Sequence, residues 1–135
     1  MSRGTDNQLP STKQFDQREQ LPASSQSTMG IDYFKFLVRE NGGVIQANCR
    51  DQLIIGRRGS MTHVDVDLAD FEARELGVSR NHCMLEYTGD RVLVRDMESI
   101  NGTFLNGQQL SPMRGYEIQH GDEIKLGRMH LLVFF

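Results

Sequence analysis

The sequence predicts an all-β protein, a sandwich of about eleven short strands over residues 31–135. Short runs of β-branched and aromatic residues recur along this part of the chain, with Gly, Asn and Asp between them. No segment keeps a 3.6-residue apolar period long enough for a core helix. The chain has 135 residues, enough for one domain with a real core but not comfortably for two.

Each strand is expected where an apolar run lies between turn residues. In order, the runs are 31–38, 44–47, 53–56, 64–68, 82–87, 91–95, 103–105, 109–110, 116–118, 123–126 and 129–135. Residues 64–68 alternate apolar and acidic side chains with period two, as a half-buried strand does. The dipeptides Gly89-Asp90 and Asn106-Gly107 indicate tight hairpin turns. Residues 68–76 can form a helical turn but are too few and too acidic for a core helix.

The apolar end of the chain, residues 129–135, predicts a buried closing strand near the first strand. An exposed apolar strand at a sheet edge would favour aggregation, so burial is the expected arrangement. The sandwich is therefore expected to be closed by its own last strand, with its binding loops gathered at one edge.

Residues 1–30 differ from the rest and are predicted to be a disordered tail. They are rich in Ser, Thr and Gln and poor in large apolar side chains, so they cannot bury enough surface to offset the entropy of ordering. Three threonines, Thr5, Thr12 and Thr28, are candidate regulatory phosphorylation sites. A phosphorylated tail could occupy a pocket on its own chain or on a neighbour; the alternative is a solubilising or tethering segment.

Charge and composition exclude several classes of protein. The 15 basic and 18 acidic side chains give a net charge of -3, which argues against non-specific nucleic-acid binding. No apolar run reaches the roughly 18 residues of a membrane span, and the N-terminus lacks the apolar core of a secretory signal. Cys49 and Cys83 are isolated and are expected to be two buried free thiols in a reducing cytoplasm. The four histidines show no ligand spacing, so neither a metal nor a cofactor is expected.

Four short motifs stand at or beside the expected strand ends. They are Gly56-Arg57, Ser79-Arg80-Asn81-His82, the run NGTFLNG at 101–107, and the run GDEIKLG at 121–127. Taken singly, each is explained as a turn or a solvated charge. Their order and spacing together resemble the forkhead-associated (FHA) family, whose signature is a Gly-Arg pair, a Ser-Arg-x-His stretch and an Asn-Gly-Thr-x-x-Asn-Gly run. The resemblance covers residues 31–135 and implies an FHA-type β-sandwich.

The resemblance also implies phosphothreonine binding by Arg57, Ser79, Arg80 and Asn101. A phosphothreonine carries about -1.5 to -2 charges and three acceptor oxygens. The planar guanidinium of Arg57 can hold two of those oxygens at once, and Ser79 adds a hydroxyl donor. Arg80 would supply a second positive charge or steady the peptide main chain. The amide of Asn101 can both donate to and accept from a peptide backbone.

Other motif residues are expected to shape the site. His82 is carried over as a scaffold residue that fixes the Ser79 loop by hydrogen bonding. The remaining site-shaping positions are Gly56, Gly102, Thr103, Asn106 and Gly107. One position departs from the family: members often carry Ser or Thr just before the Asn-Gly-Thr run, whereas this chain has Ile100, preceded by Ser99.

The implied function is that of a signalling module that recruits partners modified by a Ser/Thr kinase, the partner being that kinase or one of its substrates. A phosphate-independent scaffold of the same fold is the alternative, and the joint presence of Arg57, Ser79 and Asn101 favours phosphate recognition. Peptide selectivity is expected from the loops at 58–63, 69–78 and 96–99. The chain is not expected to be an enzyme, because no nucleophile elbow surrounds Ser79.

Overall fold

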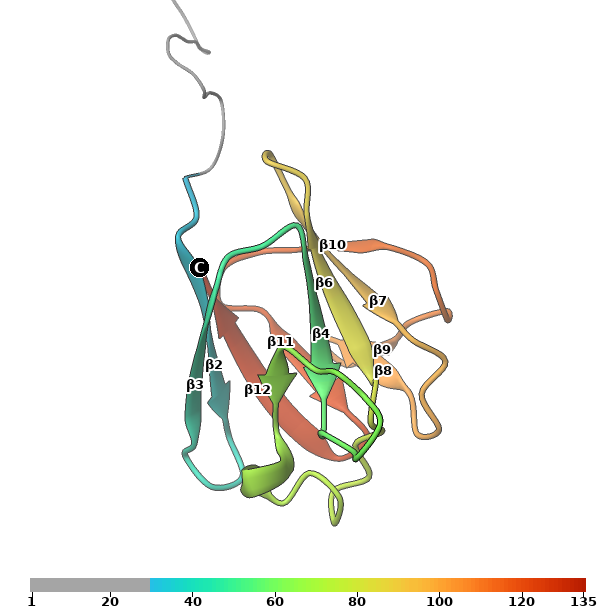
Figure 1. The fold of residues 1–135 in the computed structure, drawn as a ribbon. Coiled ribbons are helices and arrows are strands. Elements are labelled where there is room, and N and C mark those ends of the chain that lie inside the picture. Colours follow the sequence, from blue (N-terminus) through green and yellow to red (C-terminus); the bar gives the residue numbers. More distant parts are fainter. Residues whose placement is uncertain (1–29) are drawn as a thin grey trace, which may run out of the picture. The chain divides into compact units, whose positions relative to one another are not determined.

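The computed structural model describes residues 30–135, which form two β-sheets (Figure 1). Residues 1–29, including Thr5, Thr12, Thr28 and nearly all of the tail expected to be disordered, lie outside the described residues. Both sheets are antiparallel except for one parallel pair, β4 with β5. Within residues 30–135, eleven strands, five in one sheet and six in the other, confirm the predicted all-β sandwich.

Both ends of every strand lie within two residues of the predicted ends. The five-stranded sheet has the order β10-β7-β6-β4-β5, formed by Tyr116–Ile118, Val92–Asp96, Cys83–Tyr87, Gln52–Gly56 and Val66–Asp67. The six-stranded sheet has the order β3-β2-β12-β11-β8-β9, formed by Val44–Asn48, Tyr33–Val38, Met129–Phe134, Glu123–Leu126, Thr103–Leu105 and Gln108–Gln109.

The core lies between the sheets and follows from period-two alternation. In β2, Phe34, Phe36 and Val38 are fully buried while the residues between them are more exposed. Leu131 of β12 pairs with Val38, so the C-terminal strand lies beside the first strand, as predicted. Figure 1 shows the C-terminus next to the start of β2. Each fully buried large apolar side chain contributes roughly 1.5–3 kcal/mol to folding.

Strand β5 is shorter than the predicted strand at 64–68. Only Val66–Asp67 pairs with a neighbour. Asp65, just before β5, and Asp67, its last residue, also bind neighbouring backbone through their carboxylates. Asp65 Oδ2 accepts the backbone N–H of Ile54 at 2.8 Å, and Asp67 Oδ1 accepts that of Arg58 at 3.0 Å. The alternation of burial was predicted correctly, but side-chain hydrogen bonds replace part of the expected pairing.

The turns and the helical segment agree with the predictions. Asn106 and Gly107 have φ values of 48° and 90°, the left-handed pair required by the predicted tight hairpin between β8 and β9. The expected helical turn is the three-residue 3₁₀ helix η1, Ala69–Phe71. None of the helices within residues 30–135 is long and apolar enough to span a membrane.

The prediction of two buried thiols is right for Cys83 and wrong for Cys49. Both are free thiols; Cys83 is fully buried in β6, whereas Cys49 is partly exposed. Cys49 directly follows β3, the outermost strand of its sheet, where neighbours cover the chain on one side only. Burial raises the pKa of the Cys83 thiol well above its usual range.

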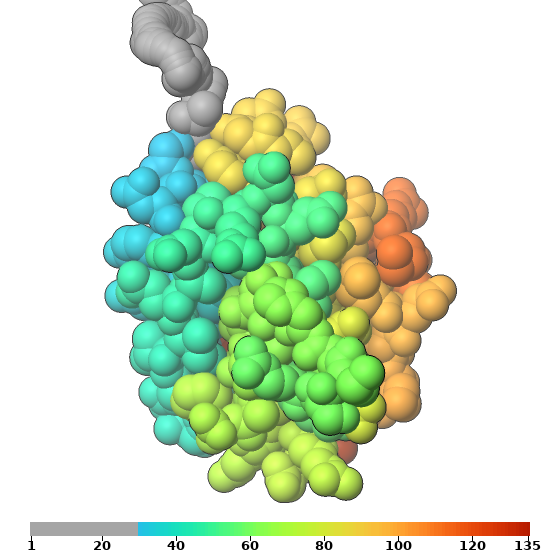
Figure 2. All heavy atoms as spheres, viewed as in Figure 1, coloured from blue at the N-terminus to red at the C-terminus, as the bar shows by residue number. Residues whose placement is uncertain are grey.

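The fold brings three loops to one end of the molecule. One loop follows β4, one precedes β6, and one joins β7 to β8. In the space-filling view of Figure 2, the green β4–β5 connection and the yellow-green residues 69–78 meet at this end of the surface. These loops carry most of the motif residues.

Candidate functional site

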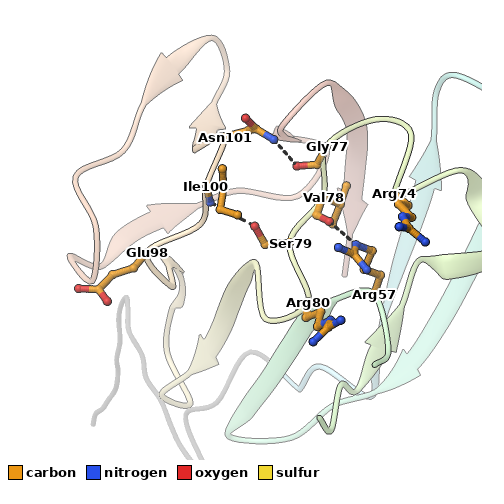
Figure 3. A pocket seen from close by; sticks show the side chains of 9 residues that line it. All are labelled: Arg57, Arg74, Gly77, Val78, Ser79, Arg80, Glu98, Ile100 and Asn101. Carbon is orange, nitrogen blue, oxygen red and sulfur yellow. Dashed lines mark hydrogen bonds between the residues drawn. The ribbon is translucent and has the colours of Figure 1, made fainter. Parts of the chain in front are cut away.

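The three loops surround one open pocket of about 510 Å³. Its lining comes from Arg57 after β4, from residues within 74–80 before β6, and from residues within 98–101 before β8 (Figure 3). All four residues expected to contact a ligand are in this lining: Arg57, Ser79, Arg80 and Asn101. Arg57 and Asn101, 44 positions apart in sequence, therefore share one pocket.

Arg57 is held at its base and open at its tip. Its Nε–H donates to the carbonyl oxygen of Val78 at 2.7 Å, and its backbone N–H reaches the carbonyl oxygens of Ser79 and Arg80 at 3.3 and 3.1 Å. Within residues 30–135 no carboxylate lies within ion-pair distance of its guanidinium. The two terminal nitrogens of a pre-positioned cationic fork are thus available to a ligand.

Gly56 allows β4 to approach the loop that carries Ser79. A Cβ atom built at Gly56 would lie 1.8 Å from the carbonyl oxygen of Arg80, a distance at which the backbone would have to move. The close contact places Arg57, the next residue, directly against the Ser79 loop. Glycine is required here by space, because any side chain would fill the gap that brings the two segments together.

Ser79 has a hydroxyl group whose proton is free to be donated. Its Oγ accepts the backbone N–H of Ile100 at 3.2 Å, which links the Ser79 loop to the loop before β8. The side chain of Arg80 is exposed, and no carboxylate among the described residues pairs with it. The pocket therefore presents one hydroxyl donor beside two arginines that have no carboxylate partner within residues 30–135.

His82 is fully buried and bridges the two loops. Its Nδ1 accepts the backbone N–H of Ser79, and its Nε2–H donates to the carbonyl oxygen of Gly102, both at 2.9 Å. Burial lowers the pKa of His82, although the bond to Gly102 and the charge of Asp96 act in the opposite direction. The ring is therefore neutral, with its proton on Nε2. Because both nitrogens are occupied by the backbone, His82 cannot serve as a base for the Ser79 hydroxyl.

Asn101 closes the pocket on the side of the β7–β8 loop. Its Nδ2 donates to the carbonyl oxygen of Gly77 at 2.9 Å, which leaves Oδ1 as an acceptor. Gly77 has a φ of 81°, and a Cβ there would lie 2.7 Å from Asn101 Nδ2, so this close approach also needs glycine. The amide spans two loops and still offers one polar atom.

A buried carboxylate, Asp96 at the end of β7, anchors the loop that carries Asn101. Its Oδ1 accepts the hydroxyl of Thr103 at 2.6 Å and also that of Ser99, while Oδ2 accepts the Ser99 backbone N–H at 3.2 Å. The Ser99 hydroxyl in turn accepts the backbone N–H of Gly102 at 3.0 Å. This role of Asp96 was not predicted from the sequence; the signal was an acidic residue at a strand end followed by Ser99 and Thr103.

Two further lining residues, Arg74 and Glu98, were not predicted as individual site residues, although they lie in the loops at 69–78 and 96–99 that were expected to set peptide selectivity. Both are charged loop residues, and the sequence does not distinguish a charged loop side chain that lines a pocket from one that only faces solvent. Counting Arg57, Arg74 and Arg80 against Glu98, the lining carries a net charge of about +2 on a chain whose net charge is -3. A cationic pocket in an acidic surface concentrates anions locally. None of the six expected site-shaping residues is in the lining itself. Gly56, His82, Gly102 and Thr103 contact the loops that carry the lining residues, whereas Asn106 and Gly107 form the turn of the β8–β9 hairpin.

Comparisons with known proteins identify the family. The family model described as "FHA domain" matches residues 53–127. Over 84 residues the chain is 34% identical to the E3 ubiquitin-protein ligase RNF8 of Rattus norvegicus, covering 62% of this chain but 16% of that protein. Protein FraH of Nostoc sp. is 35% identical over 80 residues, covering 59% of this chain and 27% of FraH. The chain therefore matches only a small part of each curated relative.

Solved structures share the fold. One, from a study of phosphothreonine-dependent FHA domain interactions, is 27% identical, with a TM-score of 0.59 over 76% of this chain and 96% of that chain. The FHA domain of FhaA, in complex with the intracellular domain of Rv3910, is 26% identical, with a TM-score of 0.56 over 74% of this chain and 98% of that chain. By its sequence match, its two-sheet architecture and these structural relatives, the chain belongs to the FHA domain family.

Proposed function

We propose that this chain binds phosphothreonine-containing segments of partner proteins, and that the phosphate occupies the pocket between Arg57, Ser79 and Arg80. One observation carries the proposal: the guanidinium of Arg57 is anchored through Nε to the Val78 carbonyl, so its two terminal nitrogens face a ligand ready to bind two oxygens.

The pocket chemistry matches a phosphate dianion. The phosphate of phosphothreonine offers three acceptor oxygens and about -1.5 to -2 charges. Arg57 supplies two donors, the Ser79 hydroxyl a third, and Arg80 a second positive charge at the mouth. The lining charge of about +2 balances that of the ligand. Since the donors are fixed before binding, little side-chain entropy is lost on association.

The backbone of the ligand has its own partner in Asn101. Asn101 Oδ1 remains an acceptor after Nδ2 has bonded to Gly77, so it is suited to receive a backbone N–H beside the phosphothreonine. Binding the phosphate and the adjacent backbone together favours a phosphorylated peptide over free phosphate.

The family relatives support the same function. The 27% identical structure was solved for phosphothreonine-dependent interactions, and FhaA was crystallised with a partner domain. By extension, we assign ligand binding to residues 31–135 and expect the partner to be a Ser/Thr kinase or one of its substrates, met in the cytoplasm. No turnover is part of the proposal, because both nitrogens of His82 are engaged by the backbone.

Fluorescence anisotropy with a degenerate phosphothreonine peptide library, and matched phosphoserine and unmodified libraries, tests the proposal. Arg57→Ala should weaken binding at least about 100-fold, because two hydrogen bonds to a charged group are lost. Arg57→Lys keeps the charge but not the fork and should also bind weakly.

Arg91→Ala is the matched control, since it removes the same charge from an exposed residue of the β6–β7 hairpin outside the lining. Equal binding of phosphorylated and unmodified libraries would refute phosphate recognition and point to the phosphate-independent scaffold instead.

A further inference from the structure

Ile100 combines high exposure with a place in the pocket. Its side chain is 89% exposed, and it is one of five large hydrophobic residues that are exposed among residues 30–135. The other four, Tyr33, Val44, Met61 and Met113, are not in the lining. A single exposed apolar side chain is ordinary on a protein surface. One held inside the pocket of a binding domain will contact whatever the pocket holds.

The backbone fixes Ile100 next to the atom proposed to bind phosphate. Its N–H donates to Ser79 Oγ at 3.2 Å. Its two neighbours are also anchored, Ser99 to Asp96 and Asn101 to Gly77, so the residue cannot withdraw by a loop shift. A β-branched side chain is also stiff about χ1. Any segment whose phosphate meets the Ser79 hydroxyl must therefore pass close to the Ile100 side chain.

The two sides of Ser79, where the phosphate is proposed to bind, differ in charge and polarity. In Figure 3, Ile100 lies on one side of Ser79, whereas Arg57 and Arg74 lie on the opposite side. The cationic side suits the phosphate and other acidic groups. The side chain of Ile100 has no hydrogen-bonding group, so it can contribute to binding only by being covered with apolar surface.

We propose that Ile100 is a specificity-determining residue that selects ligands with an aliphatic or aromatic side chain close in sequence to the phosphothreonine. This inference rests on the proposed function, because the phosphate is what brings the ligand to Ser79. A hydroxyl residue at this position would offer the ligand a polar contact, whereas isoleucine binds more favourably to an apolar side chain of the ligand. Covering a side chain of this size is expected to raise affinity roughly tenfold.

A peptide scan read against matched variants tests the inference. A phosphothreonine peptide is varied one flanking position at a time between Leu and its polar near-isostere Asn, with each peptide also made unphosphorylated. Affinities are measured for the wild type, Ile100→Ser and Val44→Ser. Val44 is a β-branched residue of β3 that is 55% exposed and lies outside both the lining and the loops expected to set selectivity, so it controls for loss of a surface hydrophobic residue. Because both positions are exposed, both variants should fold, which a thermal unfolding curve checks.

We expect at least one flanking position where the wild type and Val44→Ser bind the Leu peptide roughly tenfold more tightly than the Asn peptide. Ile100→Ser should lose that preference but still require the phosphate. If Ile100→Ser kept the Leu preference, or the wild type had none, Ile100 would not determine specificity. If the wild type bound phosphorylated and unmodified peptides equally, the proposed function would fail, and the inference with it.

Discussion

Acidification should destabilise the domain through His82, and the loss can be isolated with His82→Gln. His82 is fully buried, and its pKa is lowered from an ordinary value of 6.5 by that burial. The unfolded chain therefore takes up a proton as the pH falls through 6.5, while the folded chain does not. Stability contributed by the neutral ring is present above 6.5 and is lost as the pH falls toward the folded pKa.

The magnitude follows from proton linkage. Each pH unit between the two pKa values of His82 changes the free energy of unfolding by up to about 1.4 kcal/mol. Urea unfolding at about pH 7.5 and 5.5 should thus show a loss of up to about 1.4 kcal/mol in the wild type beyond the loss in His82→Gln. The glutamine can still reach the Gly102 carbonyl but does not titrate. Other acidic and histidine groups are common to both proteins and cancel in the difference.

Unfolding is a cleaner readout than peptide binding, because the phosphate itself titrates near pH 6. Parallel pH dependence in the wild type and His82→Gln would refute the reasoning, since it would mean that the folded protein accepts the proton as readily as the unfolded chain. It would also contradict the neutral ring that links Ser79 to Gly102.

Two further substitutions test the packing and the anchoring of the pocket. Gly56→Ala should cost about 3 kcal/mol of stability and weaken peptide binding, because the new methyl would lie 1.8 Å from a carbonyl oxygen of the Ser-Arg loop. Gly89→Ala, where a Cβ meets open space, should cost only about 1–2 kcal/mol from its positive φ; equal losses in the two urea titrations would contradict the close contact. Thr103→Val should cost about 2 kcal/mol by removing a buried hydrogen bond to Asp96. Thr88→Val removes only exposed hydrogen bonds, to Asp90 Oδ1 and to the Arg91 carbonyl oxygen, and should be nearly neutral. A comparable loss there would argue against a special role for the buried network.

Most of the fold could be predicted because period-two alternation is a local property of the sequence. Phe34, Phe36 and Val38 alternate with more exposed residues, and the structure buries them as the alternation predicts. The strand at 64–68 was overestimated because the carboxylates of Asp65 and Asp67 accept hydrogen bonds from backbone N–H groups, and apolar periodicity does not reveal such bonds.

The site was predictable only in part, and the reason is tertiary. Arg57, Ser79, Arg80 and Asn101 carry motif spacing, and the structure brings them into one lining. Arg74 has no such spacing; its place depends on how the loop from η1 to β6 turns back over β4. For a loop residue of this kind, sequence alone does not separate a pocket charge from a solvated one.

The pocket straddles the boundary between the two sheets. Arg57 and Ser79 belong to loops of the five-stranded sheet, whereas Asn101 leads into β8 of the six-stranded sheet, where the backbone N–H of Gly127 also donates to Gly102. A peptide bound across this boundary would contact both sheets, so its binding free energy would add to the free energy of unfolding. By thermodynamic reciprocity, a core substitution that loosens one sheet against the other would lower peptide affinity without touching the pocket. Occupancy could then be followed as a rise in the melting temperature.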